Sequence, residues 1–236
     1  MWLKAPNIQS IHGFSTRHGG VSSAPFDSLN LGGSDDAAPL IEENRKRALH
    51  SLGLGKHPLS ILKQVHGVQV CEACEGKQEG DALVTKEGNR TLAIGIADCY
   101  PVLFEDATAG VIGAAHAGWR GTLGKIVVHT LDKMLEQGAR RERIQVAIGQ
   151  GISQQRFEVG EEVLDQFWQA GFPKKVARQR HLDLNACLVH TLTEAGIDDT
   201  QIWSMKRCTY EDDFFSYRRD KGTTGRMWGL ISTVKA

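Results

Sequence analysis

Short apolar segments alternate with glycine and small polar residues along most of the chain, which predicts many short strands joined by tight turns. Apolar residues at helical spacing predict helices over residues 36–52, 121–138, 158–170 and 184–195, with Thr122 and Asp183 as the N-caps of the second and the last. Strands are expected over residues 59–65, 69–74, 82–85, 91–97, 144–148, 202–205 and 227–231. The strands come in groups rather than in strict alternation with helices. This favours one α+β domain over residues 1–236, with mixed, largely antiparallel sheets flanked by helices.

A β-hairpin is predicted where residues 102–105 and 111–114, both of strand character, flank a turn of small residues. If a two-residue loop follows Asp106, the numbers of paired residues sum to 215, so Cys99 lies opposite His116. Directly opposed side chains on one face of an antiparallel pair have Cβ atoms about 4.5–5.5 Å apart. The hairpin therefore brings one thiol close to one imidazole.

A third candidate for chemistry is His66, which ends another apolar segment. One cysteine and two histidines make a three-ligand zinc site whose fourth position can hold water, and such water is acidified and becomes a nucleophile. We therefore predict His66, Cys99 and His116 as metal ligands and catalytic residues. Taken singly, such a residue is more often a packed core histidine or an inert buried thiol, and it is the three together, each beside glycine or proline at a strand end, that favour the metal site. Asp98 lies on the opposite strand face from Cys99 and is expected to orient a neighbouring loop.

Charge and composition exclude several classes of partner. The 236 residues include 28 basic and 28 acidic side chains and the pI is about 7.1, so no global field attracts nucleic acid or an anionic membrane. Five cysteines in a chain of this size fit a reducing compartment better than a disulfide framework. No export signal and no membrane-length apolar run is found, which favours a soluble cytoplasmic protein. We expect a monomer or a small homo-oligomer.

Arginines at two places predict contact with an anion. Residues 12–33 hold too many polar and glycine residues for an ordinary strand or helix, so they predict a structured loop of functional length, and Arg17 lies inside it. Arg120 stands just ahead of the second expected helix, where backbone N–H groups and the helix dipole favour a phosphate or carboxylate. Arg218 and Arg219, near Gly222, are further candidates.

Longer motifs are spread over nearly the whole chain. They are Phe14-Ser-Thr-Arg17 with Gly19-Gly20-Val21-Ser22, Leu29-Asn30-Leu31-Gly32, Gln64-Val-His66-Gly, Asp81-Ala-Leu, Ala97-Asp-Cys99-Tyr-Pro101-Val, Ala115-His116-Ala-Gly-Trp119-Arg120-Gly, Phe157-Glu158-Val159-Gly and Phe214-Phe-Ser-Tyr-Arg218-Arg. Together they resemble the YfiH family. Members of that family are labelled variously as polyphenol oxidase or laccase, peptidoglycan-editing factor and purine nucleoside phosphorylase.

The resemblance implies a metal site formed by His66, Cys99 and His116, the residues that the spacing also selects. The donor set favours zinc as the metal, and the oxidase label of the family suggests copper as the other option. The resemblance further implies a YfiH-like α+β domain related to bacterial deamidating toxins that use a Cys-His pair. The implied activity is phosphorolysis of adenosine, inosine and methylthioadenosine to free base and ribose 1-phosphate, with adenosine deamination alongside.

A nucleoside and phosphate are thus the expected partners, and Arg17, Gln64 and Arg120 are the positions expected to contact them. One departure concerns Gln150 in Ile148-Gly149-Gln150-Gly151-Ile152, where the family usually has proline. Losing that proline is expected to loosen a loop beside the pocket. The change bears on substrate preference more than on the metal site.

Three other functions stay open on the sequence. A metal-free thiol hydrolase or deamidase would use Cys99 as nucleophile and His116 as base. Copper-dependent oxidation of phenols would need more histidine ligands than one such cluster supplies. A non-enzymatic role in cell-wall quality control would require only recognition of a muropeptide.

Overall fold

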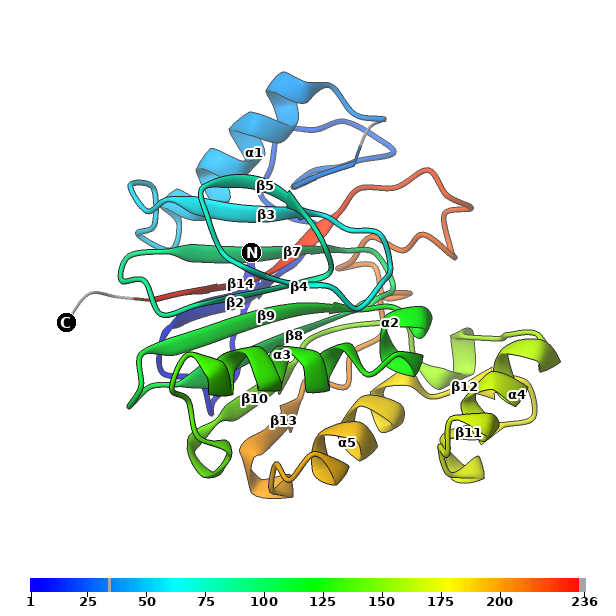
Figure 1. Cartoon of the computed structure of the whole chain (residues 1–236). Helices are drawn as coiled ribbons and strands as arrows, with labels where there is room; N and C mark the ends of the chain where they lie inside the picture. Colours follow the sequence, from blue (N-terminus) through cyan, green and yellow to red (C-terminus); the bar gives the residue numbers. More distant parts are fainter. Residues whose placement is uncertain (34, 234–236) are drawn as a thin grey trace.

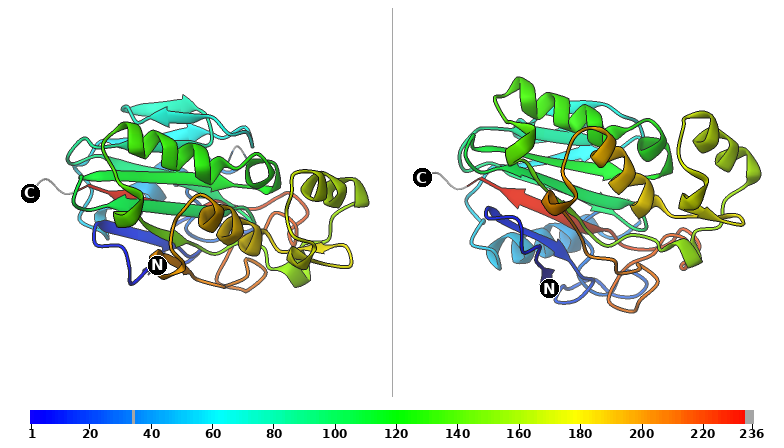
Figure 2. Two further views of the ribbon diagram at one scale, coloured as in Figure 1. Left: turned by 60° about the horizontal axis from the view of Figure 1, so that its bottom comes forward. Right: turned by 90° about the horizontal axis from the view of Figure 1, so that it is seen from below.

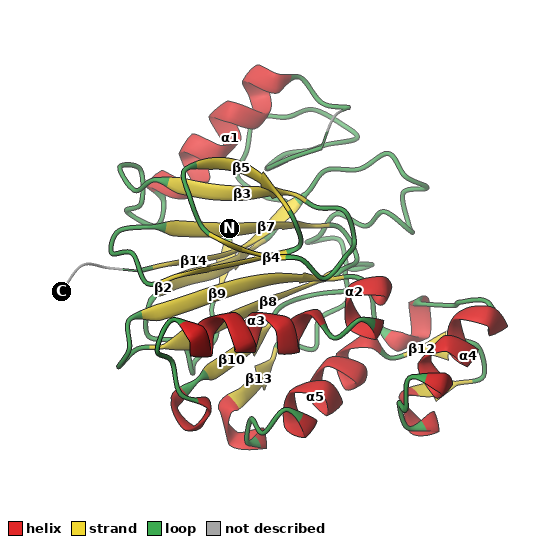
Figure 3. Cartoon of the chain, viewed as in Figure 1, coloured by secondary structure: helices red, strands yellow, loops and turns green. Residues whose placement is uncertain are grey.

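The computed structural model describes residues 1–33 and 35–233, and Figures 1 and 3 show how its helices and strands are arranged. The strands are β1 (Trp2–Leu3), β2 (Ile11–Ser15), β3 (Leu59–Lys63), β4 (Val70–Glu72), β5 (Gly76–Glu79), β6 (Ala82–Thr85), β7 (Thr91–Ile96), β8 (Tyr100–Asp106), β9 (Val111–Ala117), β10 (Gln145–Ile148), β11 (Ala177–Arg178), β12 (His181–Leu182), β13 (Ile202–Ser204) and β14 (Met227–Ser232). The helices are α1 (Ala38–His50), α2 (Trp119–Leu123), α3 (Ile126–Glu136), α4 (Glu161–Gln169) and α5 (Leu184–Glu194), with short 3-10 helices at Arg141–Arg143, Gln154–Arg156, Lys174–Val176 and Asp199–Gln201. None of these described helices combines the length and the apolar character needed to cross a membrane.

Two six-stranded sheets form the centre of the described fold. The first has the strand order β1-β2-β14-β7-β3-β5 and the second β13-β10-β8-β9-β6-β4, while β11 and β12 pair separately. The pairs of β3 with β7 and β5, of β10 with β13 and of β4 with β6 are parallel, and the other pairs are antiparallel. The predicted α+β class with mixed, largely antiparallel sheets is confirmed. The relation to Cys-His deamidating toxins and the extent of one domain over residues 1–236 stay predictions.

The two sheets pack face to face and helices cover their outer faces, as the views in Figures 1 and 2 agree. Side chains of both sheets, among them Phe14, Ile94 and Leu103, form the apolar core between them. α3 and α5 lie on the outer face of the second sheet, where they bury a second core. α1 covers the first sheet through a smaller cluster that includes Ala48 and Trp228. Burial of each sheet on both faces explains its continuous apolar strands.

Most predicted elements are present with slightly different ends. β6 spans residues 82–85 as predicted, and the strands predicted at 91–97, 144–148 and 227–231 correspond to β7, β10 and β14. α5 begins after Asp183, whose side chain accepts a hydrogen bond from the backbone N–H of Ala186 at 2.9 Å. The predicted N-cap is therefore confirmed.

The structured loop predicted over residues 12–33 begins later than expected, because Ile11–Ser15 forms strand β2 between β1 and β14. The polar residues of this strand are paired although they are buried. The His12 ring accepts a hydrogen bond from Ala5 N–H at 2.9 Å, and its other nitrogen lies 2.8 Å from the carbonyl oxygen of Ser10. Because polar residues interrupt the apolar alternation in this segment, the hydrophobicity pattern does not predict a strand there. The short strands β1, β5, β11 and β12 were likewise not predicted.

The single helix predicted over residues 121–138 is two helices. α2 begins after Gly118, and Lys125 separates it from α3 with a left-handed φ of 60°. Thr122 lies inside α2, so its prediction as an N-cap is wrong.

The predicted hairpin is formed by β8 and β9, but its register is wrong by two. Asp106 pairs with Val111 and His116 pairs with Pro101, so the paired numbers sum to 217 rather than 215. The turn has four residues because Asp106 pairs with Val111 and not with Ala109, whose N–H instead donates a hydrogen bond to the Asp106 carboxylate within the turn. A shift of two residues preserves the strand face, whereas a shift of one would reverse it. Cys99 and His116 therefore stay on one side, diagonally placed instead of directly opposed.

The Asp106 carboxylate organises the base of this hairpin. Its side chain is fully buried and accepts hydrogen bonds from the backbone N–H groups of Ala109 at 3.0 Å and Arg140 at 2.9 Å. Arg143 donates two more, from Nε at 3.0 Å and Nη2 at 2.9 Å. Burial alone would raise the pKa of Asp106, but the Arg143 hydrogen bond and the backbone donors hold it below its ordinary value.

Replacing this carboxylate should destabilise the fold in a pH-dependent way. Because the pKa of Asp106 is depressed in the folded protein, its stabilisation is present above the ordinary carboxyl range and is lost as pH falls through the depressed pKa. Asp106→Asn should lower the free energy of unfolding by about 2–3 kcal/mol near pH 7, with a smaller difference near pH 3. Urea unfolding at the two pH values measures this.

Asp132→Asn is the matched control, since that half-exposed carboxylate lies 3.5 Å from Arg141 at the surface. It should change stability by no more than about 0.5 kcal/mol. Equal midpoints for Asp106→Asn and the unsubstituted protein at neutral pH would contradict the role given to Asp106.

Candidate metal centre and active-site cavity

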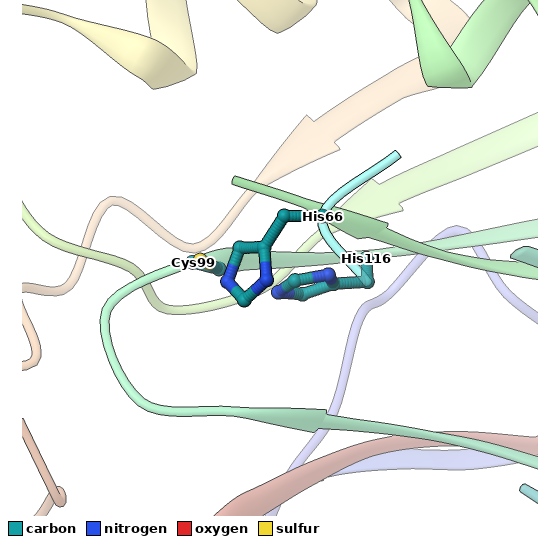
Figure 4. A group of neighbouring side chains, drawn as sticks. All are labelled: His66, Cys99 and His116. Atoms are coloured by element: carbon teal, nitrogen blue, oxygen red, sulfur yellow. The ribbon is translucent and has the colours of Figure 1, made fainter. Parts of the chain in front are cut away.

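Three side chains predicted from the sequence converge at one end of the sheets, as Figure 4 shows. His66 follows β3, Cys99 precedes β8, and His116 lies in β9. One nitrogen from each ring and the Cys99 sulfur all lie within 4.8 Å of one another. The rings of His66 and His116 meet edge to face with centroids 4.8 Å apart. The structure thus brings the predicted ligand set together.

Asp81 positions both histidines, and the sequence reasoning missed this role. Its carboxylate is fully buried and lies 2.9 Å from Nδ1 of His116. The same carboxylate accepts hydrogen bonds from the backbone N–H groups of His66 at 2.9 Å and Gly67 at 2.7 Å. Those bonds hold His66 in a left-handed conformation with φ of 59°. The available signal was an acidic residue directly before the fully buried strand β6.

The cluster is a charge pair when no metal is bound. Burial acts to raise the pKa of the Cys99 thiol, but the charge and hydrogen bond of His116, aided by His66, lower it to about 6. Burial acts to lower the pKa of His116, but the Cys99 charge and the Asp81 hydrogen bond raise it to about 9. Near neutral pH these side chains are therefore a thiolate and an imidazolium.

Because Gly118 has no side chain, the side chains of Cys99 and His66 can pack directly against its backbone. This glycine is the position that would face Cys99 if the β8–β9 register continued, and it precedes α2. A Cβ atom at Gly118 would lie 3.0 Å from the Cys99 sulfur and 3.2 Å from Cδ2 of His66. Its φ of −77° suits any residue, so the constraint is space and not backbone conformation.

A cavity of about 770 Å³ opens onto the cluster. Its lining includes the cationic residues Arg45, Lys63, Lys77, Arg218 and Arg226 and the aromatic residues Phe157, Tyr217 and Trp228. Asp98 is the acidic residue in the described lining. Five cations against one carboxylate make the cavity suited to a negatively charged ligand, although the whole chain is neutral.

Asp98 holds the loop that contributes Tyr217 and Arg218 to the cavity lining. One oxygen accepts hydrogen bonds from the hydroxyls of Thr209 at 2.6 Å and Ser216 at 2.7 Å, and the other accepts one from Arg218 N–H at 2.7 Å. The prediction that Asp98 orients a neighbouring loop is confirmed.

Of the three predicted substrate contacts, the structure brings Gln64 alone to this cavity lining. Its amide donates to the carbonyl oxygen of Gly95 at 2.7 Å and accepts from Gly95 N–H at 2.9 Å. Arg17 is paired with Asp27 at 3.0 Å. Arg120 is exposed in α2, and its guanidinium lies 4.5 Å from the ring centroid of Trp119.

Hydrogen bonds hold the loop around Gln150. The Gln150 side chain is fully buried and donates to the carbonyl oxygen of Ser15 at 3.0 Å. Gly149 N–H donates to Pro101 and Ile152 N–H to Asp98, at 2.9 and 2.8 Å. Side-chain and backbone bonds thus tie the segment to β2 and the start of β8, and the expected loosening stays a prediction.

Comparison with known proteins places this geometry in a family. Residues 11–234 match a family model described as multi-copper polyphenol oxidoreductase laccase. The chain belongs to this family. A protein named purine nucleoside phosphorylase from Deinococcus radiodurans is 50% identical over 234 residues, which cover 97% of this chain and 91% of that one. A protein named adenosine deaminase RL5, from an unknown prokaryotic organism, is 32% identical over 248 residues and 95% and 94% of the two chains.

A solved structure agrees with both the fold and the resemblance noted above. The crystal structure of the Bacillus licheniformis hypothetical protein YfiH matches with a TM-score of 0.88 and 30% identity, covering 94% of this chain and 92% of that one. Membership of the YfiH family is confirmed.

Filling the space at Gly118 should weaken metal binding. Gly118→Ala should lower zinc affinity about tenfold or more, because overpacking costs about 1–3 kcal/mol and here it displaces the sulfur of a candidate ligand. Competition with a chromogenic chelator measures the affinity. Gly55→Ala is the control, since a Cβ there meets nothing within 4 Å. Equal zinc affinity in Gly118→Ala and in the unsubstituted protein would show that the cluster does not need this space.

Proposed function

We propose that the chain is a zinc-dependent purine nucleoside enzyme. It would convert adenosine, inosine or methylthioadenosine and phosphate to the free base and ribose 1-phosphate, and would also deaminate adenosine. The carrying observation is the His66, Cys99 and His116 cluster at a cavity of about 770 Å³ that is rich in cationic and aromatic side chains. The names of two relatives, purine nucleoside phosphorylase and adenosine deaminase, support the same chemistry.

The donor set fits zinc. A thiolate and two imidazoles are ligands that zinc prefers, and three protein ligands leave a position for a reactant. Asp81 binds Nδ1 of His116, so Nε2 is the nitrogen available for a metal, as in the carboxylate–histidine arrangement of metal sites. The lowered pKa of Cys99 supplies the sulfur as thiolate near neutral pH. When bound by these residues, zinc supplies a Lewis acid with an open coordination position.

The cavity suits a nucleoside. In phosphorolysis, a phosphate oxygen bonds to C1′ of the ribose as the C1′–N9 bond breaks, and the base takes up the hydrogen that the phosphate loses. In deamination, water adds at C6 of adenosine and ammonia leaves. The partly exposed ring of Tyr217 and the edges of Phe157 and Trp228 offer apolar surface for a purine. Cationic side chains on the same wall attract the phosphate.

A product assay on metal-analysed protein tests this proposal. With adenosine and phosphate, the zinc-loaded protein should yield adenine, hypoxanthine and ribose 1-phosphate, measured by chromatography. His116→Ala should lose zinc and at least about 100-fold in turnover, since even an outer-shell change costs about 10–100-fold. His129→Ala, an exposed histidine on α3, is the control. Full turnover after complete removal of zinc would exclude the metal from the mechanism.

A thiol hydrolase or deamidase acting in peptidoglycan editing is the second candidate, because the metal-free cluster has the charges of a thiol enzyme. The Cys99 thiolate would attack an amide carbonyl and form a thioester, and the amine would leave with a proton from His116. Water would then hydrolyse the thioester. Asp81, on Nδ1 of His116, occupies the orienting position of a catalytic triad.

Alkylation of Cys99 separates the two candidates. In the metal-free protein the rate should rise with pH around an apparent pKa near 6, and in His116→Ala this pKa should move up toward the ordinary thiol range. In the zinc-loaded protein the thiolate should be protected. Mass spectrometry of iodoacetamide adducts measures both. Rapid alkylation of a zinc-saturated active protein would favour the thiol enzyme.

Copper-dependent oxidation of phenols is what the family description suggests. The described part of the chain contains one His-Cys-His group, and multicopper oxidation requires further histidine ligands. The site residues therefore support the nucleoside reaction better.

A further inference from the structure

The cavity holds two arginines that sequence reasoning did not select. Arg45 comes from α1 and Arg226 from the segment just before β14, so residues far apart in the sequence meet on one wall. Gly32 lies between them: a Cβ atom there would be 3.7 Å from Nη2 of Arg45 and 3.7 Å from Cβ of Arg226. The two side chains are therefore neighbours across a glycine that leaves the cavity wall open.

Backbone carbonyls orient both guanidinium groups without neutralising them. Nε of Arg45 donates to the carbonyl oxygen of Leu31 at 2.8 Å. Nη1 of Arg226 donates to the carbonyl oxygens of Thr224 at 2.8 Å and Gly225 at 3.0 Å. The negative charges of Asp35, Cys99 and Asp98 act on Arg226, whereas burial is the cause that shifts the pKa of Arg45. Each is thus held in position with N–H donors left for a ligand.

Of the other cations, Lys63 pairs with Glu79 at 2.8 Å and is therefore less available. Arg218, like Arg45 and Arg226, donates to a backbone carbonyl and lies over an aromatic ring, but it is exposed. Arg45 and Arg226 are half-buried, and loss of water lowers the pKa of both. Removing a cation from water is costly, and a bound anion offsets part of that cost.

We propose that Arg45 and Arg226 form a phosphate subsite in this cavity and hold the phosphate that attacks the nucleoside, an assignment that rests on the proposed phosphorolysis. Arginine forks bind phosphate oxygens in pairs, so two of them fix the orientation of the ion as well as its position. The subsite shares its cavity with Cys99 and His116, and the Cys99 charge reaches Arg226. Phosphate held there lies on the same wall as the nucleoside and the candidate metal ligands.

Steady-state kinetics on the zinc-loaded protein tests the assignment. Arg45→Gln and Arg226→Gln should each raise the KM for phosphate in inosine phosphorolysis at least about tenfold, because each removes charged hydrogen bonds. The KM for inosine and the rate of adenosine deamination, which uses no phosphate, should change less than about twofold. Arg45→Lys and Arg226→Lys, which keep the charge, should lose less. Equal losses in both reactions would mean a structural role and would overturn the proposal.

Arg47→Gln on α1 is the matched control, since Arg47 pairs with Glu43 on the exposed side. Arg17→Gln and Arg120→Gln test the alternative that the arginines predicted from the sequence bind the phosphate. If these two raise the KM for phosphate and the Arg45 and Arg226 variants do not, the subsite is misplaced.

A binding experiment separates failure of the subsite from failure of the proposed reaction. Inorganic phosphate should raise the melting temperature of the unsubstituted protein and not that of Arg226→Gln, whether or not any nucleoside is cleaved. Absence of a phosphate effect in every variant would overturn the subsite even if deamination is observed. Adenosine 5′-monophosphate tests the other source of phosphate. If it binds more tightly than adenosine and the preference is lost in Arg226→Gln, the subsite holds an ester phosphate and the co-substrate assignment is wrong.

Discussion

The Asp81 carboxylate is the constraint on which the candidate site depends. A single buried side chain bonds to the ring of His116 on β9 and to the backbone around His66, which follows β3 in the other sheet. It thereby joins the two sheets at the end where Cys99 also lies. A buried carboxylate without these donors would carry a large desolvation penalty, so the bonds that stabilise Asp81 are the same bonds that place the histidines.

The apolar core between the sheets lies directly beside a cavity that is rich in charged side chains. Between the sheets the side chains are apolar and closely packed, whereas at their ends the chain concentrates cations around one cavity. The overall charge is zero, so this field is local and acts on a ligand inside the cavity rather than on a distant polyanion. The carboxylates of Asp98 and Asp81 both accept hydrogen bonds from groups within the protein. The guanidinium groups of Arg45 and Arg226 therefore remain available to a ligand that enters the cavity.

The predicted register of the β8–β9 hairpin is wrong by two residues, yet the predicted proximity of Cys99 and His116 is correct. The sequence indicated the two strands and their small-residue turn, but the turn length depends on Asp106, whose carboxylate bonds to Arg140 and Arg143 beyond the hairpin. The sequence of the hairpin itself gives no indication that Arg140 and Arg143 bind this carboxylate. The resulting shift was even, so Cys99 and His116 remained on one face. In the same way, β2 was hidden because the polar side chains in it find partners only after folding.

The sequence by itself determined the α+β class, most strands and helices, and the three candidate ligands, because these follow from local periodicity and from residue types whose chemistry is intrinsic. Only the tertiary structure decided that Asp81 holds the histidines, that Gly118 gives them room, and that Arg45 and Arg226 share a cavity wall that Arg17 and Arg120 do not line. Those facts depend on contacts between residues far apart in the chain. Such contacts arise from packing, and no pattern along the sequence encodes their distances.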